Sequence, residues 1–557
     1  MVTSHLQEAF LHLSQHSVDS VQNGKSFTNW DEYMHVDRPI ESTLLEKMDA
    51  IDNAGGGIVL LVGSAGDGKS HLISRIKQMS DWGDNSFYND ATASSSPKKT
   101  AIDTLKEALI EYKDENLYKT SKKLVLAINL GKLNALIDDK EFIAEYKEIV
   151  NSTLPIFDDD DTTPSTDIAR VKVVMFTDEQ IFEFYTESSS DIPVNSVFMS
   201  KIMEKVVAKT SDNPFFIAYN KDLVNGISRK DPILLNYELL SIPEVRNTIV
   251  MTIIEVIVRY RLNITPREFL DFLYTIIVYP HYAEYNEKKD FFEALLPSLL
   301  YCGTENLIQK AICKLDPLKQ SSTEHDKQLS VLFTSYSIPE SYLTQLQIST
   351  LPIDLLKRTN EFYANNGRDI ERTTKFVFRL KHLLSYHSES EIYKSYLSLL
   401  KGIFQKDTYK MQSIYYIVSK AIPRHYGSYY GKSNMIPLNI QGGRYRLFGN
   451  LKLIPEKINA YNLTMYKNQF SLRFDMSWKF PDTSVKLRMD YQLYSYLHEL
   501  NRGKLALSYE NEKDLTFGRF IRRLVEQCNC EQDITVVTSD TRELELSESS
   551  FGNIQLQ

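Results

Sequence analysis

Residues 58–70 read IVLLVGSAGDGKS, and this stretch decides how the first half of the chain folds. Its first five residues form an uninterrupted apolar run, typical of a strand buried on both faces of a parallel sheet. The remainder matches the pattern G-x-x-x-x-G-K-[ST], and a helix is expected from about Lys69 to Met79. The order of strand, glycine-rich loop and helix predicts a phosphate-binding loop, because convergent backbone N–H groups and the positive end of a helix both attract an anion.

The residues of this loop have separate expected roles. Gly66 and Gly68 let the backbone N–H groups approach phosphate oxygens. Lys69 is expected to reach the β- and γ-phosphates, and Ser70 to coordinate Mg²⁺. A glycine-rich turn without a ligand is the alternative. The expected nucleotide-binding residues are Gly63, Ser64, Ala65, Gly66, Asp67, Gly68, Lys69, Ser70 and His71.

The nucleotide expected at this loop is ATP with Mg²⁺. A guanine-reading motif N-K-x-D is absent from the sequence, since residues 220–223 read NKDL and lack the Asp at the fourth position. ATP is therefore favoured over GTP. A phosphate-binding loop alone names no reaction, because kinases, GTPases and mechanical ATPases all use one.

The rest of the chain alternates between strand and helix signals. Further apolar runs at 86–88, 124–128 and 171–176 are separated by segments of helical character such as 99–115. This alternation predicts an α/β sheet. From about 197 to 420 the pattern is mostly helical, and from about 435 short strands return, among them 445–448 and 470–474.

We therefore expect an α/β chain with three parts after an N-terminal helical segment. They are a P-loop NTPase core of AAA+-like type, a helical lid and middle region, and a C-terminal mixed α+β domain. The expected boundaries are 1–50 for the N-terminal segment, 51–260 for the core, 261–410 for the lid and middle domain, and 411–557 for the β-rich mixed domain.

Polar residues that follow the apolar runs are candidates for catalysis. Hydrolysis needs a carboxylate that holds Mg²⁺ or polarises water. Asp90 follows the run at 86–88, and Asp178 and Glu179 follow the run at 171–176. Asn129 ends the run at 124–128 and is suited to orient an attacking water, as the polar sensor of AAA+-like ATPases does. Each of these residues has a helix cap or a turn as its alternative role.

Residues 265–268 read TPRE, in which Thr265 and Glu268 form a capping box and Pro266 suits the first helical position. The cap does not explain Arg267, because a cation at the positive end of a helix is unfavourable unless an anion faces it. AAA+ ATPases begin a lid helix with a similar Pro-Arg, whose Arg senses the γ-phosphate. Arg267 is therefore a candidate catalytic residue, and a surface arginine is the alternative.

Composition restricts the remaining function classes. The 557 residues carry a net charge of −9, so a nucleic-acid surface would have to be a local basic patch. Four cysteines form neither a disulfide framework nor a zinc-finger pattern. No apolar stretch of about 18 residues suggests a membrane span. We expect a cytoplasmic protein that does not contact a membrane.

Residues 408–455 form such a local basic patch, since they contain no Asp or Glu but seven Lys or Arg and seven Tyr. Cations neutralise phosphates and phenolic rings can stack on bases, so the segment is a candidate DNA surface. A tyrosine-rich domain junction and a binding site for an acidic protein are the alternatives. A second cationic group is Arg372, Lys375, Arg379 and Lys381. The candidate DNA contacts are Arg424, Lys432, Arg444 and Arg446.

Several short stretches, taken in order, resemble the DptF/DndF family of ATPase-like components of phosphorothioation-dependent DNA restriction in bacteria. They are MHVDRPIE at 34–41, GDGKSHL at 66–72, NDAT at 89–92, LAINLG at 126–131, TPREFL at 265–270, YQLY at 491–494, FI at 520–521 and FG at 551–552. The resemblance covers most of the chain, although only the phosphate-binding loop is specific by itself.

This resemblance implies a role in defence. The family's restriction complex attacks DNA that lacks a sulfur mark on its backbone, and this chain would be its ATP-binding, ATP-hydrolysing regulatory subunit. Its partners would be the other subunits and DNA, and a homo-oligomer is possible. The sequence contains no paired carboxylate–Lys cluster for DNA cleavage, so we do not expect this chain to be the nuclease. A nucleotide-dependent scaffold with little or no hydrolysis is the alternative function.

Overall fold

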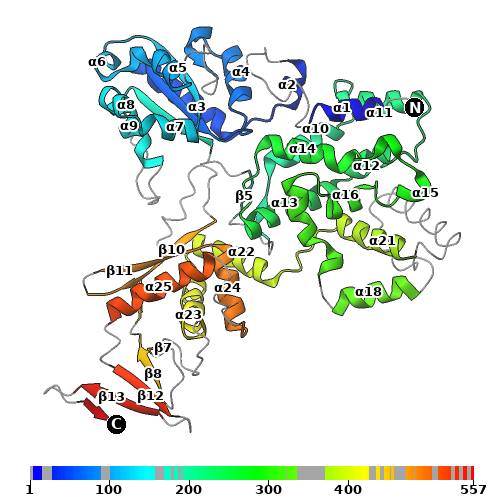
Figure 1. The fold of residues 1–557 in the computed structure, drawn as a ribbon. Helices are drawn as coiled ribbons and strands as arrows, with labels where there is room; N and C mark the ends of the chain where they lie inside the picture. The colour runs from blue at the N-terminus through cyan, green and yellow to red at the C-terminus, as the bar shows by residue number, and fades with distance from the viewer. Residues whose placement is uncertain are drawn as a thin grey trace.

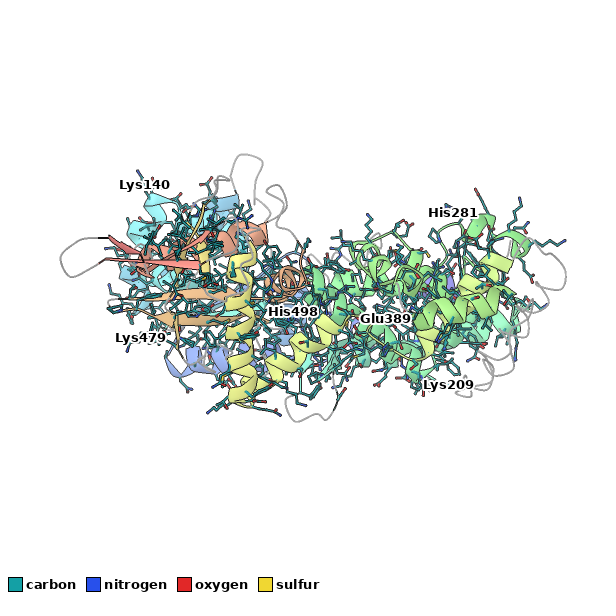
Figure 2. The ribbon with its side chains drawn as sticks, turned by 90° about the horizontal axis from the view of Figure 1, so that it is seen from below. Lys140, Lys209, His281, Glu389, Lys479 and His498 are labelled. Atoms are coloured by element: carbon teal, nitrogen blue, oxygen red, sulfur yellow. The ribbon has the colours of Figure 1, made fainter. Side chains whose placement is uncertain are left out.

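The computed structural model describes residues 4–14, 28–89, 101–156, 168–176, 181–185, 190, 192–320, 323–334, 370–425, 435–438, 445–451, 453–456, 472–481, 483–504, 512–528, 533–538, 543–548 and 554–556. They form a part built on a parallel sheet, a helical part, and a C-terminal part with antiparallel strands (Figure 1). Figure 2 gives the arrangement from below, with Lys140 in the first part, His281 at the far end of the helical part and Lys479 in the C-terminal part.

The first part contains a parallel sheet of four strands in the order β2-β3-β1-β4. The strands are β1 (Gly57–Gly63), β2 (Phe87–Tyr88), β3 (Lys123–Asn129) and β4 (Val171–Met175). All three pairings are parallel, so the carboxyl ends of the strands share one edge. The chain adds β2 and β3 on one side of β1 and β4 on the other. The end of β1 is therefore the topological switch point, where open α/β sheets bind ligands.

Alternate residues of β1 face two separate hydrophobic layers. Ile58, Leu60 and Val62 pack on the side of α5 (Ala101–Ala108), α7 (Leu130–Ile137), α8 (Lys140–Glu145) and α9 (Lys147–Thr153). Val59 and Leu61 pack on the side of α3 (Pro39–Asn53) and α4 (Lys69–Met79). Every residue of β1 is buried, which explains why the strand is apolar throughout rather than alternating. The mixed α/β class and the parallel sheet are thus confirmed.

Two predicted elements are wrong in detail. The helix expected over 99–115 is divided into α5, a 3₁₀ turn at Ile110–Tyr112 and α6 (Asp114–Leu117), because the extended backbone of Lys113 interrupts it. This break lets both Tyr112 and Leu117 reach the core. The strand expected at 470–474 is β10 (Phe474–Lys479), whose alternate residues Phe474, Met476 and Trp478 are buried.

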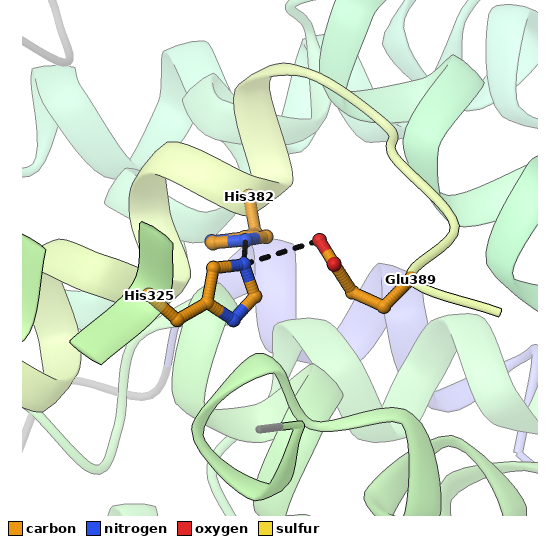
Figure 3. Close-up of side chains that lie close together, drawn as sticks. All are labelled: His325, His382 and Glu389. Carbon is orange, nitrogen blue, oxygen red and sulfur yellow. Dashed lines mark hydrogen bonds and ion pairs between the residues drawn. The ribbon is translucent and has the colours of Figure 1, made fainter. Parts of the chain in front are cut away.

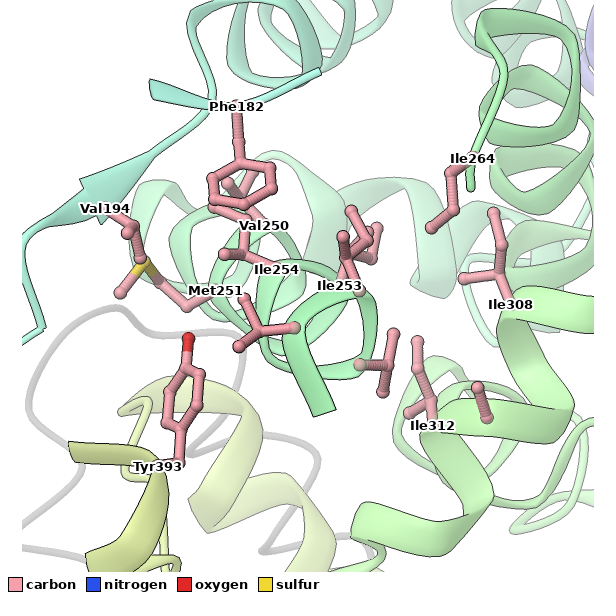
Figure 4. Close-up of a cluster of buried hydrophobic side chains, with 14 of the residues drawn as sticks. Phe182, Val194, Val250, Met251, Ile253, Ile254, Ile264, Ile308, Ile312 and Tyr393 are labelled. Carbon is pink, nitrogen blue, oxygen red and sulfur yellow. The ribbon is translucent and has the colours of Figure 1, made fainter. Parts of the chain in front are cut away.

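The helical part surrounds α13 (Pro243–Tyr260) (Figure 4). Residues 248–258 of this helix are all buried and most of them are apolar, so this stretch is stable only inside a core. Its neighbours include Ile308 and Ile312 on one side and Tyr393 on another. The other helices of this part are α10 (Val197–Val207), α11 (Pro214–Val224), α12 (Pro232–Leu240), α14 (Pro266–Ile277), α15 (Glu287–Asp290), α16 (Leu296–Cys302), α17 (Leu307–Ile312), α18 (Thr323–Thr334), α21 (Ile370–Leu384) and α22 (Glu391–Phe404).

The N-terminal helix α1 (His5–Leu11) packs against α11 rather than against the parallel sheet. Leu6, Phe10 and Leu13 are buried in the core of the helical part. Asp222 of α11 accepts hydrogen bonds from the Ser4 hydroxyl at 2.7 Å and from the His5 backbone N–H at 2.8 Å. Residues 4–11 are therefore fixed to the helical part, while α2 (Asn29–Met34) and α3 lead back to the sheet.

The C-terminal part combines helices with antiparallel strands. Its helices are α23 (Thr408–His425), α24 (Tyr491–Asn501) and α25 (Glu512–Cys528). One sheet has the order β11-β10-β9 and the other β14-β13-β12-β8-β7. The strands are β7 (Met435–Pro437), β8 (Tyr445–Asn450), β9 (Ile454–Pro455), β10, β11 (Ser484–Met489), β12 (Asp533–Thr538), β13 (Glu543–Glu548) and β14 (Ile554–Leu556). A small pair, β5 (Glu183–Phe184) and β6 (Val194–Asn195), lies beside α13. Among the described helices, none has both the length and the apolar character needed to span a bilayer.

Candidate functional site

The glycine-rich loop, residues 63–70, connects the end of β1 to the start of α4. Gly66 and Gly68 have φ angles of 90° and 95°, a region that favours glycine. Gly68 is the N-cap residue of α4, and no side chain caps that helix. The first turn of α4 therefore presents its backbone N–H groups and the positive end of the helix toward the loop, an arrangement that can bind an anion.

The ammonium group of Lys69 lies across the loop. Its Nζ donates hydrogen bonds to the carbonyl oxygens of Gly63 at 3.0 Å and Ser64 at 2.6 Å. The Asp67 carboxylate accepts a hydrogen bond from the Ser64 backbone N–H. Burial lowers the pKa of Lys69 and raises the pKa of Asp67. The loop thus holds a partly desolvated cation at the end of the strand, where its attraction to an anion is strengthened.

Arg38 supplies a second cation, which the sequence reasoning did not single out. Its guanidinium donates to the Asp67 carbonyl oxygen at 2.8 Å and lies 5.2 Å from the ring centroid of Phe176 and 5.7 Å from that of Phe198. The residue precedes α3, which packs on the same face of the sheet as α4. In the sequence, Arg38 was noted only as part of the family-like stretch 34–41. No pattern in the neighbouring residues indicates that its side chain reaches the loop.

The N-terminus of α14 contacts the same loop. The predicted capping box is confirmed: Thr265 accepts from the Glu268 backbone N–H at 3.3 Å, and Glu268 accepts from the Thr265 backbone N–H at 2.8 Å. The Arg267 backbone N–H donates to the Gly66 carbonyl oxygen at 3.4 Å. A Cβ on Gly66 would lie 2.9 Å from the Thr265 hydroxyl oxygen, so this position needs glycine for space as well as for conformation. The helix that carries Arg267 therefore begins at the loop.

Asn129 ends β3 and lies opposite Gly63 in the register of the sheet. Its side-chain oxygen accepts a hydrogen bond from the Lys132 backbone N–H at 2.8 Å and caps α7. The structure therefore bears out the alternative role as a helix cap. The NH₂ end of the same side chain is the end that could meet a ligand at this edge.

His71 follows the loop and pairs with His35. The His71 Nε2 lies 3.0 Å from the His35 Nδ1, and the two rings are stacked with centroids 5.3 Å apart. Burial, with the nearby His35, lowers the pKa of His71 to about 4. On its other side, His35 Nε2 lies 3.1 Å from Asp37 and 3.2 Å from Glu41. The His71 side chain thus connects α4 to the segment that carries Arg38.

The candidate DNA residues differ in their surroundings. Arg424 donates to the Asn501 side-chain oxygen at 3.0 Å and to the Lys420 carbonyl oxygen at 3.1 Å, which ties α23 to α24. Arg446 is exposed on β8. In the second cationic group, Arg379 forms a buried ion pair with Asp316. Its charge is therefore neutralised inside the protein rather than presented to DNA.

Five predicted site residues lie outside the described residues. They are Asp90, Asp178, Glu179, Lys432 and Arg444. Asn89, the neighbour of Asp90, directly follows β2 at the same edge of the sheet as the loop. The carboxylate that would hold Mg²⁺ therefore stays a prediction.

Comparison of this chain with protein-family models, with curated proteins and with solved structures gives no match.

Proposed function

We propose that the glycine-rich loop binds Mg-ATP and that the parallel sheet is the core of a P-loop NTPase of AAA+-like type. One observation carries the proposal: two cations, Lys69 and Arg38, and the N-termini of two helices, α4 and α14, meet at residues 63–70. A triphosphate is the biological anion that such a loop accommodates, with backbone N–H groups on its oxygens and a lysine on its outer phosphates. Its position at the switch point of the sheet supports the same assignment.

The proposed activity is ATP hydrolysis that regulates a bacterial DNA restriction complex dependent on phosphorothioation. The sequence resemblance to the DptF/DndF proteins supports this part of the proposal. The chain would couple its nucleotide state to assembly on DNA or to action at DNA through partner subunits, and another chain would cut the DNA. Calorimetric titration with Mg-ATP, followed by phosphate release measured with and without DNA, tests it.

The second candidate is a nucleotide-dependent scaffold with little or no hydrolysis. The side-chain oxygen of Asn129, the atom that would accept a hydrogen bond from an attacking water, is occupied as a helix cap, which favours this candidate. ATP binding at micromolar affinity, without phosphate release in the presence of DNA or partner subunits, would select it over the ATPase.

Arg267 is expected to act on the transition state rather than on ground-state binding. The contact of its helix with the loop, through the backbone of Gly66, supports an approach of the side chain to the γ-phosphate. We expect Arg267→Ala to lower the ATPase kcat by about 100-fold while the affinity for ATP changes little. Steady-state kinetics and calorimetry check this. Arg246→Ala is the control, since Arg246 donates to carbonyl oxygens at the end of α12. An equal loss of affinity and kcat in Arg267→Ala would contradict the role.

Direct DNA contact predicts a specific effect at Arg446, the exposed candidate on β8. A cation that contacts a phosphate contributes to affinity and to its salt dependence. We expect Arg446→Ala to weaken DNA binding and to reduce the slope of log K against log salt by about 1. Lys479→Ala is the control, since Lys479 is exposed on β10, outside the basic segment 408–455. An unchanged slope in Arg446→Ala, measured by fluorescence anisotropy at several salt concentrations, would remove this residue from the DNA surface.

A further inference from the structure

Three side chains of the kinds that bind metals meet in the helical part, from three separate segments. His325 lies on α18, His382 lies on α21, and Glu389 lies in the short segment that leads into α22 (Figure 3). Each offers one ligand atom, and the three atoms all lie within 4.8 Å of one another. The cluster is in a different part of the molecule from the glycine-rich loop and takes no part in the proposed ATP chemistry.

The distances between these atoms suit a small cation. His325 Nε2 lies 3.4 Å from His382 Nε2 and 3.1 Å from Glu389 Oε1. Around a four-coordinate zinc ion with bonds of about 2.0–2.1 Å, ligand atoms lie about 3.3–3.4 Å apart. The two imidazole planes cross at 89°, so the rings approach through their edges rather than by stacking (Figure 3). The ligand atoms of the third pair, His382 and Glu389, lie within 4.8 Å of each other.

The hydrogen bonding of His382 orients one nitrogen toward the other two ligands. Its Nδ1 lies 2.9 Å from the Phe378 carbonyl oxygen, which can only accept, so Nδ1 carries the proton. The lone pair is therefore on Nε2, the atom that faces His325. Zinc-binding histidines are commonly oriented by a carbonyl oxygen in this way.

The surroundings leave room on one side of the cluster. His325 is buried, and the ring of Phe378 packs on both imidazoles, with centroids 5.1 Å and 4.6 Å away. His382 and Glu389 line a small pocket with a volume of about 30 Å³. The other carboxylate of that pocket, the buried Glu255, accepts hydrogen bonds from Arg259, Tyr386 and Ser388, which leaves Glu389 as the carboxylate for a cation. The pocket gives an entry path and space for a water ligand.

We propose that His325, His382 and Glu389 bind a zinc ion, with water in the fourth position. Two imidazole nitrogens and one carboxylate oxygen are a set that zinc binds tetrahedrally. The ion would fasten α18 to α21 and to the segment before α22, and because it binds the folded chain it stabilises that fold. A second group, His35 with Asp37 and Glu41, is a weaker candidate: it has one nitrogen ligand, and hydrogen bonding of His35 Nε2 to the two carboxylates accounts for its distances.

The experiment measures zinc in the full-length protein without nucleotide. The protein is dialysed against a chelator, then titrated with zinc sulfate in competition with a chromophoric chelator, while thermal unfolding is followed. We expect one equivalent of zinc per chain, a rise in Tm with zinc, and the visible absorption of four-coordinate cobalt when Co²⁺ replaces zinc. In His382→Gln and Glu389→Gln the zinc affinity is expected to fall at least about 100-fold.

Two control variants identify the site. His281→Gln changes an exposed histidine far from the cluster, and His35→Gln changes the other group; both are expected to bind zinc as the unaltered protein does. Glu389→Gln keeps the size of the side chain and hence the fold, which circular dichroism verifies, so loss of zinc is distinguishable from failure to fold. The proposal is overturned if the unaltered protein binds no zinc at micromolar concentration. It is equally overturned if both cluster variants retain zinc, or if His35→Gln loses it instead. If any of these results is obtained, a hydrogen bond from His325 Nε2 that is shared between Glu389 and His382 explains why the three side chains lie together.

Discussion

Lys69→Ala is expected to abolish ATP turnover, with a loss of at least about 1000-fold in kcat/KM. The Lys69 ammonium is half-buried and lies between the carbonyl oxygens of Gly63 and Ser64, where no other side chain of the loop can replace its charge. In Lys69→Ala, a triphosphate bound at the start of α4 would still accept hydrogen bonds from the backbone N–H groups, but it would lack the cation at its outer phosphates. Phosphate release and calorimetric titration with Mg-ATP provide the measurement.

Lys77→Ala is the matched control for this experiment. Lys77 lies two turns further along α4, where its ammonium stacks on the ring of Phe87 rather than near the loop. The Lys77→Ala substitution also removes one positive charge from α4. We expect its ATP turnover to stay within about twofold of that of the unaltered protein, because the Lys77 side chain does not contact the loop. ATP turnover that survives Lys69→Ala would exclude residues 63–70 as the hydrolytic site and would refute the ATPase proposal.

Asp316→Asn is expected to destabilise the folded chain by about 3–5 kcal/mol. The Asp316 carboxylate accepts from Arg379 through both Nε, at 3.1 Å, and Nη2, at 2.7 Å. The exposed fractions are 3% for the Asp316 side chain and 12% for Arg379, so the pair is shielded from water. Removing one charge leaves the guanidinium buried without its counter-ion, and that desolvation cost dominates the loss. Denaturant unfolding, followed by circular dichroism, measures it.

Glu293→Gln is the control, because it also removes the carboxylate partner of an arginine on α21. Glu293 pairs with Arg372 of α21, but the two side chains are 47% and 35% exposed. Water screens this pair, so we expect its loss to cost no more than about 1 kcal/mol. Equal destabilisation by Asp316→Asn and Glu293→Gln would show that burial of the Arg379 pair does not determine its contribution.

The candidate site was predictable where its signals are local. The run at 58–62 and the glycines after it predict β1, the loop and α4, and the structure begins and ends α4 at the expected residues. The capping box at 265–268 was equally predictable, because its hydrogen bonds join residues three positions apart. In both cases backbone conformation is specified by neighbouring residues, so a single sequence contains enough information.

Two predictions about elements failed because packing overrode local pattern. Helical character over 99–115 did not reveal the break at Lys113, which is set by the need to bury both Tyr112 and Leu117 under the sheet. The strand expected at 470–474 begins at Phe474, because its pairing with β11 and the burial of Trp478 fix which residues alternate inward. Propensity is a weak guide where tertiary contacts determine which positions are buried.

By itself the sequence determined a buried parallel strand, the glycine-rich loop that follows it and the capped start of α14, since hydrophobic periodicity and glycine conformations act over a few residues. Only the tertiary structure decided that Arg38 and the backbone of Arg267 meet that loop, and that His325, His382 and Glu389 converge. These contacts join segments far apart in the chain, and their geometry depends on how whole helices pack. Long-range packing follows from the summed burial of many apolar side chains, so no short motif records it.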